Sequence, residues 1–425
     1  MPNRESVPHQ SLVPTSGAAN DELRWLFDLT AIPTASGREQ GVIRWIELWV
    51  EARPDLRLVR DGAGNLVIER ADAKAPESVA PLFITAHLDH PAFVVERTIG
   101  PGAVGASFRG GVMDPYFRNA PVVVFPSGDG AAGPIRGTVV HKEKREPFHQ
   151  CVIELEGEGE ASGPVRPGDI ARWDLPEPAI EGDVFHTHAC DDLAAAAAAL
   201  AALDRIRSRP ETGHTRLLFT RAEEVGFIGA IAACKQRTMP ANSRVIALET
   251  SRSYPHDSPI GGGPIVRVGD RISTFSPSLT AAVARVAEKL AERRAATNGA
   301  ARPPTGTGSI AGRAATGSTE GFKWQRKLMP GGACEASAFQ AYGYEATCVC
   351  LPLGNYHNMA DLEGVQRGDV TAVSAARAGR EFISVSDYRG MIDLLEFCAS
   401  GLAQAEPLAE RMEKLFADKA FVLDG

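Results

Sequence analysis

The sequence predicts an α/β fold in which a mixed-sheet α/β/α catalytic domain carries an inserted all-β, barrel-like domain. Short apolar strands alternate with amphipathic helices before residue 91 and after residue 186, which is typical of a sheet covered by helices. Between residues 92 and 185 β-like runs rich in Val, Gly and Pro recur, and convincing amphipathic helices are missing. With 425 residues, 44% of them hydrophobic, the chain is long enough for a large core and two domains.

The first part of the chain predicts the start of the α/β domain. Residues 1–19 are rich in Pro, Ser, Asn and Gln, and we expect this N-terminus to be disordered. Apolar residues at helical spacing predict two helices, and alternating apolar residues around a Gly-rich turn predict a hairpin. These elements are the helices 22–29 and 39–50, the hairpin 56–69 and the strand 81–86.

The insertion interrupts the catalytic domain, which we therefore predict to be discontinuous, comprising residues 20–91 and 186–425. Within the inserted domain 92–185, strands are predicted at 92–99, 121–125, 135–141 and 151–155. The catalytic domain resumes with an Ala-rich helix after Asp192 and with buried strands at 217–220 and 245–248. Residues 296–319 carry little to bury, and a stretch of this length predicts a mobile loop.

Composition and charge exclude some classes of protein. A net charge of −8 at pH 7 argues against a nucleic-acid partner, which would need dense Lys and Arg surfaces. No apolar run reaches membrane-spanning length, and the first residues lack the pattern of a signal peptide. The seven cysteines are widely spaced, which suits a reducing compartment. We expect a cytoplasmic protein that binds neither nucleic acid nor membrane.

Five short fragments carry the residue types of a dinuclear metal site. Each has acidic or imidazole side chains at or near the end of an expected strand or the start of a helix. Carboxylates and imidazoles are ligands of Zn²⁺, and the carboxyl ends of strands in an α/β domain meet at one ligand site. The fragments are His87-Leu88-Asp89, Cys190-Asp191-Asp192, Ala222-Glu223-Glu224-Val225-Gly226, Leu248-Glu249-Thr250 and Tyr356-His357-Asn358.

Each fragment alone also has a plain structural interpretation. His87 and Asp89 could form a surface pair, and Asp191 or Asp192 could cap the following helix. The adjacent carboxylates of Glu223 and Glu224 repel each other unless a cation or a proton intervenes. That pair is therefore the most specific fragment, although two solvated acids in a loop remain an alternative.

The remaining two fragments and a nearby histidine pair are less specific. Glu249 could be a loop acid and His357 a capped imidazole. His186 and His188 share one face of an extended segment, a spacing that can bind metal. We expect these two histidines to line a pocket or lie at the surface instead, because the other fragments already supply enough ligands. Cys190 is expected to be a core residue.

In their order and spacing the fragments resemble the co-catalytic dizinc exopeptidases, and among them the tetrahedral or glutamyl aminopeptidases that carry a β-domain insertion. The resemblance covers nearly the whole chain from about Asp21. It implies that Asp89 orients a metal-binding histidine and that Glu223 acts as the general base. It also implies a metal-ligand set, with Asp191 bridging both ions: His87, Asp191, Glu224, Glu249 and His357.

Three positions depart from the pattern of that family. His90 stands where an acidic residue often follows the first His-x-Asp, and Glu335 stands where an Asp is more usual. Glu249 occupies a ligand position that is usually Asp in the aminopeptidases. A Glu there is similar to the related carboxypeptidases and deacylases, which leaves open the end of the substrate that is cut.

The resemblance implies a metal-dependent aminopeptidase that hydrolyses short peptides. Two divalent ions, zinc or alternatively cobalt or manganese, would lower the pKa of a bound water towards about 7. The alternatives are a carboxypeptidase or N-acyl amino acid amidohydrolase on the same core, acting on a small amide, and a non-catalytic homologue. The family also implies a homo-oligomer in which the inserted domain contributes contacts.

Overall fold

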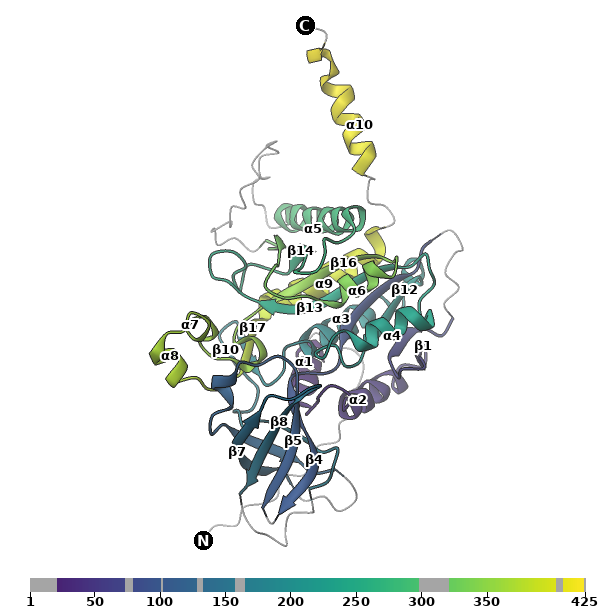
Figure 1. Ribbon diagram of the computed structural model, residues 1–425. Helices are drawn as coiled ribbons and strands as arrows, with labels where there is room; N and C mark the ends of the chain where they lie inside the picture. Colours follow the sequence, from purple (N-terminus) through teal and green to yellow (C-terminus); the bar gives the residue numbers. More distant parts are fainter. Residues whose placement is uncertain are drawn as a thin grey trace.

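The computed structural model describes residues 21–72, 79–100, 102–127, 133–156, 165–297, 321–402 and 408–423. It shows an α/β/α domain with a closed β-barrel projecting from it (Figure 1), which confirms the predicted fold class. The expected disordered N-terminus, residues 1–19, lies outside the described residues, as do residues 298–320. Ala296 and Thr297, predicted to begin a loop, form the last turn of helix α5 instead.

The described helices cover both faces of the main sheet or extend from the α/β domain. They are α1 (Asp21–Ala31), α2 (Gln40–Glu51), α3 (Leu193–Ile206), α4 (Ile228–Gln236), α5 (Pro277–Thr297), α6 (Glu335–Ala341), α7 (Leu362–Gln366), α8 (Val370–Ser374), α9 (Val385–Gly401) and α10 (Leu408–Lys419). Short 3₁₀ helices include η3 (Tyr356–Asn358) and η5 (Ala420–Leu423).

The main sheet has eight strands in the order β1-β2-β12-β3-β13-β16-β14-β15. Its four central strands, β12, β3, β13 and β16, run parallel to one another. The strands are β1 (Leu56–Arg60), β2 (Leu66–Arg70), β3 (Leu82–His87), β12 (Thr215–Thr220), β13 (Arg244–Arg252), β14 (Ile265–Gly269), β15 (Gln325–Leu328) and β16 (Glu345–Leu353).

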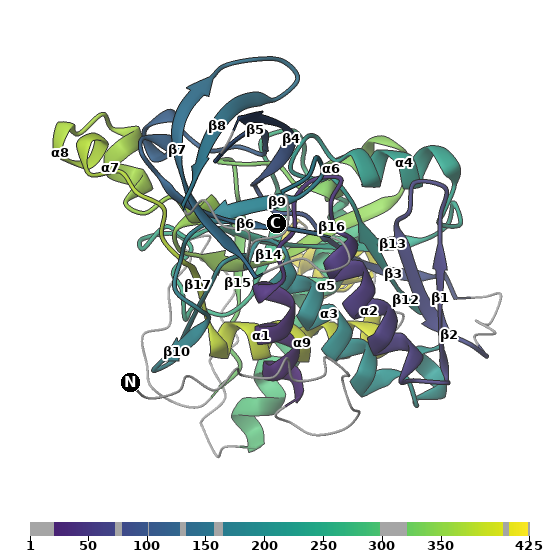
Figure 2. The ribbon, with the colours of Figure 1, turned by 90° about the horizontal axis from the view of Figure 1, so that it is seen from below.

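Helices shield both faces of the central strands from water. Helices α1, α2, α3, α5 and α9 share one hydrophobic core with the sheet, whereas α4 and α6 pack on the opposite face. Figure 2 shows α1, α2 and α3 side by side, and α3 packs between α1 and α9. All six residues of β3 are buried, as expected for a parallel strand covered on both sides. The Ala-rich sequence of α3 fits its position in this core, where Leu193 through Leu203 are all buried.

The inserted segment folds into a closed barrel with strand order β4-β5-β8-β7-β6-β9. An aromatic cluster of Phe93, Phe108, Phe117 and Trp173 fills its interior. Of the six barrel strands, the sequence-based predictions missed two, β5 and β9. The barrel strands are β4 (Ala92–Gly100), β5 (Ala103–Arg109), β6 (Pro121–Phe125), β7 (Ile135–Glu143), β8 (His149–Leu155) and β9 (Ile170–Trp173).

A small third sheet joins the segment after the barrel to the C-terminal part of the chain. Its order is β10-β11-β17, with β10 (Ala179–Glu181), β11 (Val184–Thr187) and β17 (Glu381–Ser384). The antiparallel pairing of β11 with β17 sets Thr187 opposite Glu381. This pairing fixes the loop that leads from β11 to Asp191. Among the described helices, none combines the length and apolar character that crossing a bilayer requires.

Candidate metal centre

The parallel strands deliver the predicted site residues to one edge of the main sheet. His87 is the last residue of β3, where it is aligned with Thr220 at the end of β12. Glu223 follows β12, Glu249 lies near the end of β13, and His357 follows β16. Because the carboxyl ends of parallel strands meet at the same edge, residues far apart in sequence become neighbours there.

Asp191 lies at the centre of the cluster, with its two carboxylate oxygens directed at different histidines. Its Oδ1 is 3.2 Å from His87 Nε2, and its Oδ2 is 3.5 Å from His357 Nε2. Asp191 is buried, with only 1% of its surface exposed. One carboxylate between two imidazoles has the arrangement that a ligand shared by two cations requires.

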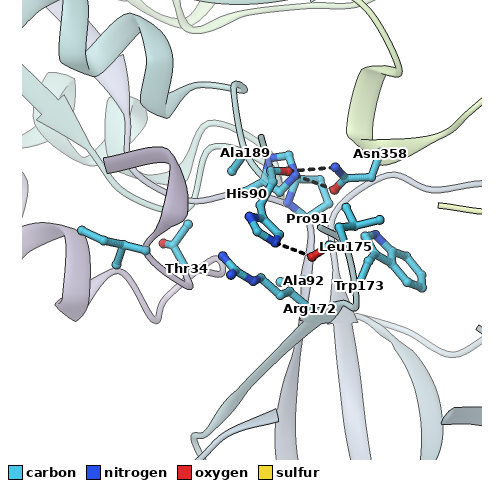
Figure 3. A pocket seen from close by; sticks show the side chains of 11 residues that line it. Thr34, His90, Pro91, Ala92, Arg172, Trp173, Leu175, Ala189 and Asn358 are labelled. Atoms are coloured by element: carbon cyan, nitrogen blue, oxygen red, sulfur yellow. Dashed lines mark hydrogen bonds between the residues drawn. The ribbon is translucent and has the colours of Figure 1, made fainter. Parts of the chain in front are cut away.

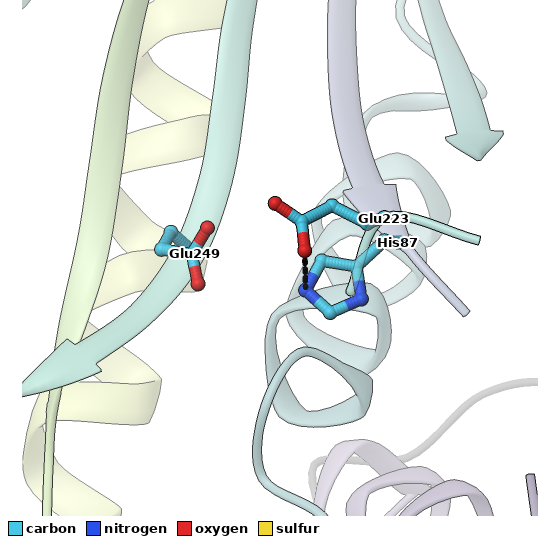
Figure 4. Close-up of side chains that lie close together, drawn as sticks. All are labelled: His87, Glu223 and Glu249. Carbon is cyan, nitrogen blue, oxygen red and sulfur yellow. Dashed lines mark ion pairs between the residues drawn. The ribbon is translucent and has the colours of Figure 1, made fainter. Parts of the chain in front are cut away.

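Each histidine brings an acidic partner to its own side of Asp191. Glu224 Oε1 is 3.4 Å from His357 Nε2. Ligand atoms of His87, Glu223 and Glu249 lie within 4.8 Å of one another, and so do those of His87, Asp191 and Glu224. Figure 4 shows Glu223 and His87 in contact, at 3.8 Å, and Glu249 facing them from β13.

Backbone carbonyls orient both imidazole rings. His357 Nδ1 is 2.7 Å from the carbonyl of Gly111, and His87 Nδ1 is 3.1 Å from the carbonyl of Asp89. An N–H donated from Nδ1 to a carbonyl leaves Nε2 as the unprotonated nitrogen. In the tautomer that makes both of these bonds, each ring presents a lone pair to the cluster, as metal-bound histidines do.

The cluster contains buried carboxylate oxygens that lack a hydrogen-bond donor. They are Asp191 Oδ1, Glu224 Oε1 and both oxygens of Asp192. Buried carboxylates are normally paired or bound to a cation. Burial raises the pKa of Glu224 and Glu249 well above their ordinary values, and the negative charge of Asp191 raises them further. The residues present therefore fit divalent cations.

Glu223 lies in the same buried setting, next to the proposed ligands. Burial raises the pKa of its carboxyl well above its ordinary value; His87 opposes this rise and Glu335 adds to it. Its backbone N–H donates to Asp89 Oδ1 over 2.9 Å, and that of Glu224 donates to Asp89 Oδ2 over 3.1 Å. Asp89 thus holds the Glu-Glu segment in place.

The geometry of Asp89 differs from the expected pairing of its carboxylate with His87. Its Oδ1 is 3.5 Å from His87 Nδ1, whereas its backbone carbonyl is closer. The Ser36 hydroxyl donates to Asp89 Oδ2 over 2.5 Å. The aspartate carboxylate accepts hydrogen bonds from the Ser36 hydroxyl and from the backbone N–H groups of Glu223 and Glu224 instead.

Glu381 is a buried neighbour of the cluster that sequence reasoning missed. Its Oε2 accepts hydrogen bonds from the backbone N–H groups of Cys190 (2.7 Å) and Asp191 (3.0 Å). Its Oε1 accepts one from the N–H of His357 over 2.8 Å. One carboxylate therefore joins the two loops that carry Asp191 and His357. A lone Glu in a short strand gives no signal in sequence, because the contacts depend on the pairing of β17 with β11.

Two further acids, both outside the predicted ligand set, lie near the cluster. Glu335, at the start of α6, is buried, and burial raises its pKa to about 7. Asp192 begins α3 without making a side-chain capping bond, so the capping interpretation fails for this residue. Asp192 lies close enough to His87, and Glu335 close enough to Glu223, to influence the pKa of each.

His90 faces the backbone of the site rather than its carboxylates. Its Nδ1 is 2.6 Å from the carbonyl of Asp191, and its Nε2 is 3.0 Å from Asn358 Oδ1. Burial lowers the pKa of His90 to about 4. The Asn358 amide donates in turn to the carbonyl of His188 over 2.8 Å. His90 and Asn358 thus tie together three backbone segments beneath the cluster.

The histidine pair that precedes Asp191 lies away from the metal-ligand atoms. His186 packs against Phe382 in the third sheet. His188 Nε2 is 3.2 Å from the carbonyl of Leu175, and its ring lines a small pocket between the barrel and the α/β domain. Figure 3 shows this pocket, with Arg172 and Trp173 of β9 on one side and His90 and Asn358 on another.

A larger cavity opens beside Glu249. Its volume is about 270 Å³, and β13, the loop before α6 and the segment after β16 form its wall. Tyr356, which stacks on the His357 ring with centroids 3.8 Å apart, borders the same cavity. Its lining is mixed: Met329, Met359 and Leu362 are apolar, whereas Arg252, Asp257 and Arg267 are charged. The cavity has the size and position to receive one substrate side chain.

The backbone is strained at two of the site loops. Ala222, directly before Glu223, has φ 53°, and His357 has φ 54°. Non-glycine residues avoid this left-handed region, at a cost of roughly 1–2 kcal/mol. Such strain persists where the surroundings hold the chain in place, and it clusters at functional sites. Here it sets the directions of the Glu223 and His357 side chains.

Comparison with known sequences matches this chain to one peptidase family. A sequence model described as M42 glutamyl aminopeptidase matches residues 64–293, more than half of the chain. A putative aminopeptidase of Acetivibrio thermocellus is 25% identical over 270 residues, which cover 60% of this chain and 76% of that protein.

Solved structures share the fold at low sequence identity. The TET1 peptidase of Pyrococcus horikoshii has a TM-score of 0.64 and 20% identity, and the match covers 89% of this chain and 99% of that one. The aminopeptidase APDkam598 of the archaeon Desulfurococcus kamchatkensis has a TM-score of 0.64 and 18% identity, covering 92% and 98% of the two chains. Both matches include the barrel as well as the α/β domain.

Proposed function

Because the chain belongs to the M42 glutamyl aminopeptidase family, we propose that it removes N-terminal residues from short peptides at a dinuclear metal centre. The position of Asp191 carries this proposal, since its two oxygens face two different histidines. His87, Glu249 and Asp191 would hold one ion, and His357, Glu224 and Asp191 the other. Zinc suits this set of ligands, and cobalt or manganese would also bind.

Glu223 is the proposed general base. When bound, the two ions supply a water of lowered pKa and polarise the substrate carbonyl. Glu223 accepts the proton of that water at a carboxylate oxygen and then delivers it to the departing amine nitrogen. The bonds from the N–H groups of Glu223 and Glu224 to Asp89 fix the backbone that carries the Glu223 side chain.

Glu381 is a positioning residue for this chemistry. Its three accepted hydrogen bonds keep the Asp191 and His357 loops at a fixed separation. A ligand set that is already ordered binds metal with less loss of conformational entropy. Glu381 would therefore raise metal affinity without touching an ion.

The cavity beside Glu249 would receive the side chain of the residue that is removed. The apolar part of a side chain would bury its surface against Met359 and Leu362, and Arg267 adds a positive charge to the same wall. A panel of peptides with free or blocked termini tests the direction of cleavage. An aminopeptidase loses its substrate when the amine is acetylated, whereas a carboxypeptidase loses it when the carboxyl group is amidated.

We also propose a domain division and a homo-oligomer. The catalytic domain would comprise residues 20–91 and 186–425, and the inserted domain residues 92–185, which contain every strand of the barrel. The TET1 peptidase of similar fold can assemble into a tetrahedron or a large octahedral shell. Assembly of this chain through its barrel would restrict access to peptides and other small substrates.

Glu223→Gln tests the function directly. The variant keeps the size of the side chain and removes the proton acceptor, so peptide hydrolysis should fall about 10²- to 10⁴-fold while bound metal stays at the wild-type content. Glu51→Gln is a matched control, because Glu51 is exposed at the end of α2. Full activity in Glu223→Gln would refute the assigned role.

A further inference from the structure

The C-terminal helix α10 exposes its apolar side chains to solvent instead of packing them against the described part of the chain. It projects away from the α/β domain (Figure 1), and every side chain from residue 409 to residue 419 is exposed. Met412, Leu415 and Phe416 are 47%, 46% and 61% exposed. Phe421 and Leu423 of η5 are 71% and 73% exposed. Contiguous apolar exposure of this kind marks an interaction surface.

A helix of this length is not stable alone. It has 12 residues, and isolated helices shorter than about 12–15 residues are marginal in water. Met412, Leu415 and Phe416 are spaced so that they form one stripe on the helix. Burial of that stripe against a partner would stabilise the helix.

We propose that α10 pairs in antiparallel fashion with α10 of a second copy of this chain. In the proposed register Met412 of one helix lies opposite Leu415 of the other. The two-fold symmetry repeats this contact, so that two Met412–Leu415 layers form the centre of the interface. Phe416 then lies over the small Ala409 of the second helix. The stripe is thereby self-complementary, as a two-fold interface requires.

Charge favours this partner and this direction. Arg411 and Asp418 are seven residues apart and lie on the same side of the stripe, each one residue before a position that faces the other helix. In an antiparallel helix pair, residues on this side of one helix contact residues on the same side of the other. Two Arg411–Asp418 ion pairs form by symmetry. In a parallel pair Arg411 would instead face Phe416, which leaves the charges unpaired.

The polar residues argue against a membrane surface as the partner. Residues 409–419 contain three acidic and three basic side chains, so the helix carries no net charge. Helices that lie on anionic membranes are rich in Lys and Arg on their polar face. Two short helices contribute modest affinity alone, but chains already assembled through other surfaces would hold them at high effective concentration.

Two single charge reversals, each made in the full-length protein, test the pairing. Arg411→Asp gives a helix with two acidic flanking residues, and Asp418→Arg gives one with two basic flanking residues. Each variant should repel its own copy. When the two variants are co-expressed in one cell, the flanks become complementary and pairing should return.

Amide hydrogen exchange of residues 408–423 at low salt reports the result. Wild-type protein should exchange at least tenfold more slowly there than either single variant, and the co-expressed pair should recover most of that protection. Glu413→Lys, a reversal outside the contact, should leave protection unchanged. Exchange within α3 should be the same in all samples, which shows that the α/β domain is intact.

Three results would overturn the proposal. The first is wild-type exchange as fast as in an unfolded peptide, because α10 would then have no partner. The second is protection that both single variants retain, which would mean that the helix docks without the ion pairs. The third is protection that both variants lose and co-expression does not restore, because the partner would then be a surface other than a second α10.

Discussion

Replacing Glu381 by Gln should weaken metal binding although the side chain touches no proposed ligand atom. Glu381 accepts N–H bonds from Cys190, Asp191 and His357. A glutamine has one carbonyl oxygen and one NH₂ group. If the oxygen still accepts the hydrogen bonds from the Cys190 and Asp191 N–H groups, the NH₂ group faces the N–H of His357. Both of these groups are donors, so no hydrogen bond forms between them.

The size of the effect follows from that one lost bond. A buried N–H without an acceptor costs about 1–3 kcal/mol. Relief of this cost requires the His357 loop to move, which separates His357 from Asp191 and Glu224. Residues that orient metal ligands typically change metal affinity about 10- to 100-fold. We expect a loss in that range, mainly for the ion held by His357.

Competition with a chromophoric chelator measures the affinity of each metal equivalent in the full-length protein. Thermal unfolding of the metal-free variant gives its stability separately. Glu181→Gln is a matched control, because Glu181 lies on β10 of the same small sheet with its side chain 67% exposed. Metal affinity within twofold of wild type in Glu381→Gln would refute the positioning role.

Other changes give independent checks. Burial raises the pKa of Glu335 to about 7 and that of Asp387 to about 6, so each of these two carboxyl groups binds more protons in the folded metal-free protein than in the unfolded chain. The free energy of unfolding of wild type, taken relative to that of the double variant Glu335→Gln/Asp387→Asn, should therefore fall as pH rises from about 4 to 7, and a difference that grows over this range would contradict the shifts. Ser36→Ala removes a donor to Asp89 and should lower activity severalfold with metal content unchanged, whereas unaltered kinetics would show that the bond is dispensable. Phe93→Ala in the barrel core should cost about 3–5 kcal/mol of stability, measured by denaturant unfolding, and a loss below 1 kcal/mol would contradict the packing described.

The fold could be predicted wherever local pattern and burial agree. The helix spacing of α1 and α2 and the hairpin of β1 and β2 are local features, and the structure contains all four elements. Strand β5 was missed because Gly105, Ala106 and Ser107 interrupt its apolar pattern. Strand β9 was missed because it has only four residues, one of which is Arg172. The inward side chains of these strands, such as Phe108 and Trp173, pack against the other strands only when the barrel closes, so local sequence does not mark them.

The candidate site could be predicted because its residues follow strands. Apolar runs in the sequence predict the strands that end at or near His87 and Glu249. If these strands lie parallel in one sheet, their carboxyl ends bring the two residues together. Glu381, Ser36 and Asn358 could not be found in this way. Their roles arise from backbone contacts between segments that lie far apart in the chain, and no residue type or spacing marks such contacts.

Anomalous diffraction from zinc-loaded crystals would test the central claim most directly. The proposed site predicts two anomalous peaks per chain, one on each side of the Asp191 carboxylate. One peak should lie among His87, Asp191 and Glu249, and the other among His357, Asp191 and Glu224, with Glu223 bound to neither ion. A single peak, or a pair of peaks that does not share Asp191, would contradict the dinuclear site.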